Sequence, residues 1–418
     1  MLILKIIKKY LKPFKNHKGD KNMSMTTEIK VVSTIQRIDK KALNVYQWRY
    51  SDFTLPEYQS PVNTVEEKEK QPFRIDIDAK NSDIKNGIFG FDKIPNNYTN
   101  ICKSDIENLC QEYKLIADIL DKEYLPPWLS IRKGQTVELE FNWKKKSRAK
   151  DYSKIAFDTH ADFTITPADL KDANKIQITC NNTNPQPAQL LIKADNTTVG
   201  ALNIFYPKPK SIDLEWFFVE IKGNLKDYNE LDNKIKLSKV MDLLKKGLNP
   251  ALIDINIKNA IASTVNLETQ KEYFKTSGII KKTSEYHYIE NSKKELFVAA
   301  LNKVHKADKT IATLFLVNRS CLNTGATGED GGAFDVIAGF SPINTGIAYG
   351  ILDNEGDLLP TAIMHEVMHA LGLQHTFSTR AKHTFTAKKT KNYMDYKGSK
   401  EFTWKWQWSK LHTYKFLK

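Results

Sequence analysis

Four residues near the C-terminus have the types and the spacing to hold and use a metal ion: His365, Glu366, His369 and His375. Positions i and i+4 of an α-helix lie on one face, so His365 and His369 can present their imidazoles to one ion. Gly372 stands where this helix can end, because glycine adopts the left-handed conformation without steric cost. The chain can then turn and bring in His375 as a third ligand. Three histidines with one open position are typical of a catalytic zinc site.

Glu366 follows the first histidine directly, so its side chain lies on a different face of the helix. From that face its carboxylate can reach a water molecule bound to the ion, and we interpret it as the catalytic base. Two histidines and a glutamate at this spacing also occur by chance on surface helices. The added glycine and third histidine make the pattern much more specific, and it predicts a bound Zn²⁺ that activates water.

The complete pattern HEVMHALGLQH resembles the HExxHxxGxxH motif of the metzincin clan of zinc metallopeptidases. The resemblance implies a Met-turn after the third histidine, and Met394 in the segment NYMDY stands at a suitable distance. In the astacin-like and serralysin-like branches a tyrosine two residues later reaches the zinc, which implies this role for Tyr396. A packed aromatic residue at a turn is an equally weighted alternative. Thr376 replaces the acidic residue or serine of several branches, so the chain fits none of them cleanly.

The resemblance implies a zinc metalloendopeptidase. Zinc lowers the pKa of its bound water to around 7, Glu366 takes the proton and passes it to the leaving amine, and Tyr396 can donate to the developing oxyanion. The expected substrate is a protein or peptide that binds in extended form along a sheet edge. Gly346–Leu352 is the predicted edge, because it precedes the motif helix and its glycines allow close approach of another backbone.

After Ser211, predicted strands alternate with predicted helices, and these elements must position the candidate site residues. This order predicts an α/β zinc metallopeptidase domain over residues 211–418. The aromatic segment Trp404–Trp408 is interpreted as its closing helix. The other expected elements are strands at Leu214–Ile221, Leu252–Ile257 and Ile311–Val317, a helix from Leu237 to about Gly247, a helix from Ser292 to about His305 opened by a capping box with Glu295, a Gly-rich loop at Gly325–Gly332, and the motif helix from Pro360.

The preceding residues predict a multidomain chain. Residues 126–209 hold short alternating segments at Thr136–Trp143, Lys175–Thr179, Gln189–Lys193 and Val199–Phe205, which indicate a β-sandwich of immunoglobulin-like type. Pro207 and Pro209 then mark a linker. Residues 23–125 form a mixed N-terminal region with one helical pattern, Ser104–Asp121.

Charge is concentrated at the two ends of the 418-residue chain. Residues 1–22 carry seven lysines against Asp20, and the residues after His375 carry eleven Lys or Arg against two acidic residues, within a formal net charge of +14. We interpret residues 1–22 as a basic tail, with a membrane-lying amphipathic helix as the alternative. No nucleic-acid motif accompanies the charge, so no nucleic-acid partner is expected. No segment is long and apolar enough to predict a transmembrane helix.

Four cysteines without a CxxC pair do not indicate a disulfide scaffold or a cysteine zinc site, although Cys102 and Cys110 could either pair or remain thiols. The absence of a recognisable export signal favours a bacterial effector or toxin protease, injected or secreted by a signal-independent route, with secretion machinery or an immunity protein as partners. The alternatives are an exported metallopeptidase that degrades extracellular protein, and a non-catalytic zinc-binding adhesion protein. The intact Glu366 counts against the last alternative.

Overall fold

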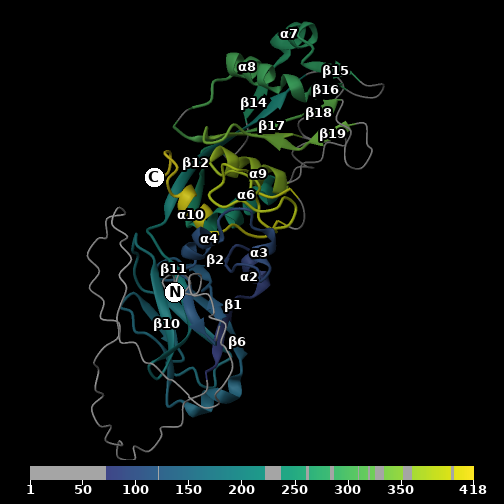
Figure 1. Ribbon diagram of the computed structural model, residues 1–418. Helices are drawn as coiled ribbons and strands as arrows, with labels where there is room; N and C mark the ends of the chain where they lie inside the picture. The colour runs from purple at the N-terminus through teal and green to yellow at the C-terminus, as the bar shows by residue number, and fades with distance from the viewer. Residues whose placement is uncertain are drawn as a thin grey trace, which may run out of the picture. The chain divides into compact units, whose positions relative to one another are not determined.

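The computed structural model describes residues 72–120, 122–221, 237–259, 263–282, 287–308, 310–318, 321–324, 334–351, 360–396 and 400–418. The predicted basic tail and its membrane contact, residues 23–71, and the Gly325–Gly332 loop lie outside them. The described residues belong to one compact unit, Glu67–Lys418, and form a mixed α/β structure with several sheets (Figure 1). Within this described part, no helix has the length and apolar character needed to cross a bilayer.

Two sheets from the first part of the unit share one hydrophobic core. Their orders are β1 (Arg74–Asp78), β6 (Thr136–Lys144), β9 (Lys175–Cys180), β8 (Phe163–Thr166), and β2 (Gly90–Asp92), β5 (Trp128–Ser130), β11 (Thr197–Phe205), β10 (Ala188–Ala194), β7 (Ile155–Phe157). Strand β6 alternates as expected, with Val137, Leu139 and Phe141 in the core. The four strands predicted in this region are confirmed.

The predicted helix Ser104–Asp121 is wrong in its second half. Helix α4 covers only Ile106–Glu112, Lys114 then takes a left-handed conformation with φ of 48°, and the chain continues as β3 (Ile116–Ile119), which pairs with β4 (Lys122–Tyr124). Tertiary packing overrides the helical spacing, because Ile119 is buried with Tyr124 and Ala201 rather than against α4.

The central sheet of the second part is parallel except at one edge. Its order is β13 (Ile253–Ile257), β12 (Lys210–Glu220), β17 (Ala312–Val317), β21 (Ile347–Ile351) and β20 (Gly339–Phe340), with β14 (Ser263–Asn266) also pairing with β12. Alternate residues of β12 enter different cores: Trp216 joins one core with helices α6 (Leu237–Leu248) and α9 (Pro360–Ala370), and Phe217 joins another with helices α7 (Lys271–Thr276) and α8 (Lys294–Val304). The helices therefore cover both faces of the sheet (Figure 1).

Two details correct the predicted arrangement of this sheet. Strand β21, which corresponds to the predicted edge Gly346–Leu352, lies inside the sheet, and β20 pairs antiparallel with it and forms the edge instead. The predicted capping box of Ser292 and Glu295 is also absent. A turn of 3₁₀ helix at Asn291–Lys293 precedes α8, whose first residue is Lys294 and whose N-cap side chain makes no capping hydrogen bond. The chain enters the helix directly from that turn.

A small sheet positions the start of α8 beside the segment that leads into β20. It contains β15 (Ile280–Lys282), β16 (His287–Glu290), β18 (Cys321–Thr324) and β19 (Phe334–Ile337). Strand β16 runs into the 3₁₀ turn before α8, while β19 precedes β20 by one residue. The sheet thus holds Asn291 and Lys294 near the edge strand of the central sheet.

The largest core joins residues from both sides of the predicted linker. Ile101, Tyr113, Trp128 and Phe205 are buried in the same cluster as Trp408 of helix α10 (Lys405–Leu411). The expected closing helix is confirmed, and its tryptophans pack in this core. The division between residues 209 and 211 remains a prediction, but the shared core favours folding of both parts together.

We expect a fragment of residues 211–418 to be far less stable than the full chain. The fragment lacks the side chains before residue 211 that pack in the same core as Trp408. Each large apolar side chain that this leaves exposed costs about 1.5–3 kcal/mol of folding free energy. A loss on the order of 5 kcal/mol is comparable to the whole stability of a typical domain. Thermal and urea unfolding of both proteins measure this. A fragment that melts within a few degrees of the full chain would contradict the expectation and support a boundary at the prolines.

Candidate metal centre

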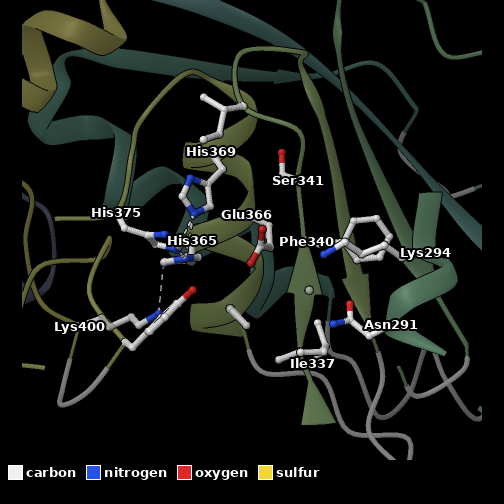
Figure 2. Close-up of a pocket in the computed structure, with 15 residues that line it drawn as sticks. Asn291, Lys294, Ile337, Phe340, Ser341, His365, Glu366, His369, His375 and Lys400 are labelled. Atoms are coloured by element: carbon white, nitrogen blue, oxygen red, sulfur yellow. Dashed lines mark hydrogen bonds between the residues drawn. The ribbon is translucent and has the colours of Figure 1, made fainter. Parts of the chain in front are cut away.

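Helix α9 is held by its apolar side, which leaves its histidines facing the pocket. Every residue from Ile363 to Ala370 is buried. Ile363 and Met364 pack in the core that α6 and the central sheet share. His365 and His369, four residues apart, line a pocket on the other side of the helix (Figure 2).

The turn after the helix has the conformation expected from its glycine. Gly372 has a φ of +100°, and its N–H donates to the carbonyl oxygen of His369 at 2.9 Å. The N–H of Leu373 donates to the carbonyl oxygen of Met368 at 2.9 Å, which closes the end of the helix. A residue with a Cβ is strained at this φ, so glycine allows the reversal that returns His375 to the pocket.

The three predicted histidine ligands converge on one point. The Nε2 atoms of His365 and His375 are 3.0 Å apart, those of His365 and His369 are 3.1 Å apart, and those of His369 and His375 are 2.9 Å apart. They form the one group of potential metal ligands of this kind found among the described residues. The structure therefore confirms that the three side chains come together.

The hydrogen bonds of the Nδ1 atoms in two of these rings show which form the Nε2 atoms take. His365 Nδ1 is 2.8 Å from the carbonyl oxygen of Tyr393, and His369 Nδ1 is 2.7 Å from that of Leu373. A carbonyl oxygen only accepts hydrogen bonds, so each Nδ1 donates and each Nε2 presents a lone pair. Lone pairs facing each other at 3.1 Å repel unless a cation lies between them. The arrangement matches that of metal-binding histidines, which donate through their second nitrogen.

The three imidazoles are neutral at pH 7. Burial is the main cause: it lowers the pKa of His365 to about 2, that of His375 to about 4, and that of His369 below its ordinary value of 6.5. The nearby Lys400 ammonium shifts all three pKa values in the same direction. The neutral form is the one that binds a metal ion. Because the unfolded chain takes up these protons more readily, the stability that the three neutral histidines contribute to the metal-free protein is lost as the pH falls below 6.5.

Glu366 lies beside the histidines, against the edge strand β20. Its side chain is so close to this strand that a Cβ at Gly339 would stand 2.6 Å from Glu366 Cγ, so only glycine fits there. Burial raises the pKa of Glu366 to about 8, although Lys400 and Lys294 act in the opposite direction. A carboxyl group with this pKa can take up and release a proton near neutral pH. A metal dication nearby would favour its carboxylate form.

A tight turn beyond the third histidine supports the ring of His365. The N–H of Asp395 donates to the carbonyl oxygen of Asn392 at 3.0 Å, and the turn presents the Tyr393 oxygen to His365. Asp395 is fully buried and accepts hydrogen bonds from the N–H groups of Lys388 and Tyr396, each at 2.8 Å.

Met394 is also fully buried, in the core that contains α9. The turn predicted around Met394 is present, and its identification as a Met-turn is part of the proposal below.

Tyr396 stands at the mouth of the pocket with 59% of its surface exposed. Its ring centroid is 4.7 Å from that of His375 and 4.8 Å from that of Phe377. Partial desolvation at the pocket mouth and the charge of Glu366 raise the pKa of Tyr396 above its ordinary value of 10, so its hydroxyl keeps its proton at neutral pH.

Residues that sequence patterns did not predict complete the pocket, which has a volume of about 540 Å³. Lys294 enters it from the start of α8, Asn291 from the 3₁₀ turn before that helix, and Phe340 from β20. Lys400 lies across from them, and its Nζ is 3.4 Å from His365 Nδ1. The Nδ1 proton is donated to the carbonyl oxygen of Tyr393, which is closer. The one sequence feature that could have predicted Lys294 as a pocket residue is its charge at the start of a helix. Charged residues at helix starts are common on protein surfaces, so this feature is not specific.

His383, Cys102 and Cys110 do not line this pocket. His383 is buried beside Trp406, with Nε2 3.8 Å from a carboxylate oxygen of Glu112. Cys102 and Cys110 are both free thiols, as are the other two cysteines, so the alternative of a Cys102–Cys110 pair is not realised.

The chain matches no model of a known protein family, and a comparison with curated proteins finds no match either. The chemistry of the site therefore follows from its own residues. Two buried histidines and one partly buried histidine, all neutral, can hold a metal ion beside a buried carboxyl group, in a pocket that borders a sheet edge.

Proposed function

We propose that this chain is a zinc-dependent endopeptidase of the metzincin clan, with His365, His369 and His375 as the metal ligands and Glu366 as the catalytic base. The observation that carries the proposal is the convergence of three Nε2 atoms within 3.1 Å of one another beside a buried carboxyl group. Three histidine ligands with an open position are typical of catalytic rather than structural zinc. When bound, such an ion lowers the pKa of a water molecule to around 7 and polarises a carbonyl group.

The protein groups around the site have separate roles in this proposal. Glu366 accepts the proton of the attacking water and returns it to the leaving amine. The Tyr396 hydroxyl donates a hydrogen bond to the oxyanion of the substrate, and Met394 is the methionine of the Met-turn. Gly339 positions the Glu366 side chain, because no other residue leaves room for it.

We propose that the substrate binds in extended form along β20. One side of this strand pairs with β21, and its other side pairs with no strand that the structure describes. Gly339 of β20 borders Glu366 directly, so a peptide added to this edge would pass in front of the catalytic base. The substrate edge is thus assigned to β20 in place of the predicted Gly346–Leu352.

The finer fold assignments belong to the same proposal. A single core shared by two sheets supports a β-sandwich, for which we keep the immunoglobulin-like type, and the helix-covered parallel sheet with one antiparallel edge supports a metzincin-like α/β domain. The role as an effector or toxin protease, delivery by a signal-independent route, and the secretion and immunity partners remain predictions from the sequence.

The proposal is tested by cleavage of a proteome-derived peptide mixture with the purified full chain. We expect new peptide termini with the zinc-loaded protein, their loss after treatment with a chelator, and their return when zinc is added. Mass spectrometry of the products identifies the cleaved bonds, and metal analysis should find about one zinc per chain. Cleavage that persists in a metal-free preparation, or no cleavage by the zinc-loaded protein, would refute the proposal.

A further inference from the structure

Two lysines that the proposed reaction does not use line the pocket on opposite sides of Glu366. Lys294 is the first residue of α8, and Lys400 follows the turn at Asn392–Asp395 (Figure 2). Glu366 is the one acidic residue that lines the pocket among the residues described. A bound metal dication would add to this excess of positive charge, so the pocket favours an anionic ligand.

Lys294 differs from Lys400 in that no contact joins it to a candidate metal-ligand histidine, whereas Lys400 Nζ lies 3.4 Å from His365 Nδ1. Lys294 is partly buried, and its Nζ lies 5.8 Å from the centre of the Phe340 ring on β20, the proposed substrate strand. Its side chain points toward Glu366 (Figure 2), and its charge acts on that carboxyl group. Within the described part of the chain it forms no ion pair. A partly buried ammonium group beside the substrate edge is therefore open to a counterion from the substrate.

A second polar group at the same end of the pocket lacks a partner. The Oδ1 atom of Asn291 is buried and accepts no hydrogen bond from any residue that the structure describes. Asn291 lines the pocket next to Ile337 (Figure 2). A buried carbonyl oxygen without a donor costs free energy, and the N–H of a bound peptide would satisfy it.

We propose that Lys294 and Asn291 form a specificity subsite that selects a substrate with an aspartate or glutamate side chain close to the cleaved bond. Lys294 pairs with the side-chain carboxylate, while Asn291 Oδ1 accepts a hydrogen bond from the substrate backbone. The Phe340 ring lies under Lys294 Nζ and keeps it at the edge strand through a cation–π contact. This inference rests on the proposed peptidase function and names its substrate class.

The test is a peptide library in which each position around the cleaved bond is varied between Glu, Gln and Lys. We expect wild-type kcat/KM to be at least about tenfold higher for Glu than for Lys at one position. Lys294→Glu should reverse this order, and Lys294→Met should abolish the difference. Lys293→Glu is the matched control, because it makes the same charge change one residue away at an exposed side chain outside the pocket. It should keep the wild-type preference.

The outcomes separate this inference from the proposed function. Cleavage without an acidic preference, or a preference that Lys294→Glu leaves unchanged, overturns the subsite while the peptidase stands. No cleavage by the zinc-loaded protein refutes the function and the subsite together. If the Lys294 variants fail to fold, the subsite is tested on the wild-type protein alone. Its acidic preference should shrink as salt rises from about 0.05 M to about 0.5 M, because ions screen the pair. A preference that salt does not change argues against Lys294.

Discussion

Glu366→Gln is expected to lower kcat/KM for peptide cleavage by about a hundredfold or more while the zinc content stays near one per chain. Glutamine has nearly the same shape, so it fits against Gly339, but it cannot accept the proton of the attacking water. The proposed metal ligands are three histidines, which the substitution leaves unchanged. Steady-state kinetics and metal analysis on the same preparation measure both quantities.

Two comparisons make this result specific. Glu295→Gln makes the same chemical change at an exposed position of α8 and should leave turnover unchanged. Tyr396→Phe removes one hydroxyl donor and should lower kcat/KM by about tenfold to a hundredfold. A Glu366→Gln protein with wild-type turnover would show that the mechanism is wrong, even if the histidines hold zinc.

His369→Ala is expected to remove both the metal and the activity. The side chain supplies one of three converging Nε2 atoms, and the remaining pair, 3.0 Å apart, is a poor zinc site. Since losing a supporting partner of a ligand already costs tenfold to a hundredfold in affinity, losing the ligand should cost at least about a hundredfold. Zinc competition with a coloured chelator measures the affinity, and circular dichroism shows whether the chain still folds.

His160→Ala is the control for His369→Ala. His160 is a half-buried histidine of the first part of the unit and does not line the metal pocket, so the variant should keep zinc and activity. A His369→Ala protein that binds zinc as tightly as the wild type would remove His369 from the ligand set. A fully active, metal-free wild-type preparation would overturn the whole proposal.

The elements with strong local patterns could be predicted from the sequence. Strand β12 is buried on both faces and strand β6 alternates, so both carry a clear pattern of apolar residues. The predicted helix at Ser104–Asp121 failed in its second half because Leu115, Ile116 and Ile119 fit a helical spacing, but Ile116 and Ile119 pair with the strand that follows. The edge strand β20 has two residues, too few for any periodic pattern.

The sequence by itself determined the three candidate metal ligands, because their convergence depends mainly on local geometry. The spacing of His365 and His369 along one helix and the left-handed turn at Gly372 need no distant partner to bring three imidazoles together. Only the tertiary structure decided what surrounds them. Lys294 lies 72 positions before Glu366 and reaches the pocket because the small sheet places α8 beside β20. Such contacts depend on how separate elements pack against one another. The spacing of residues along the chain does not predict that packing.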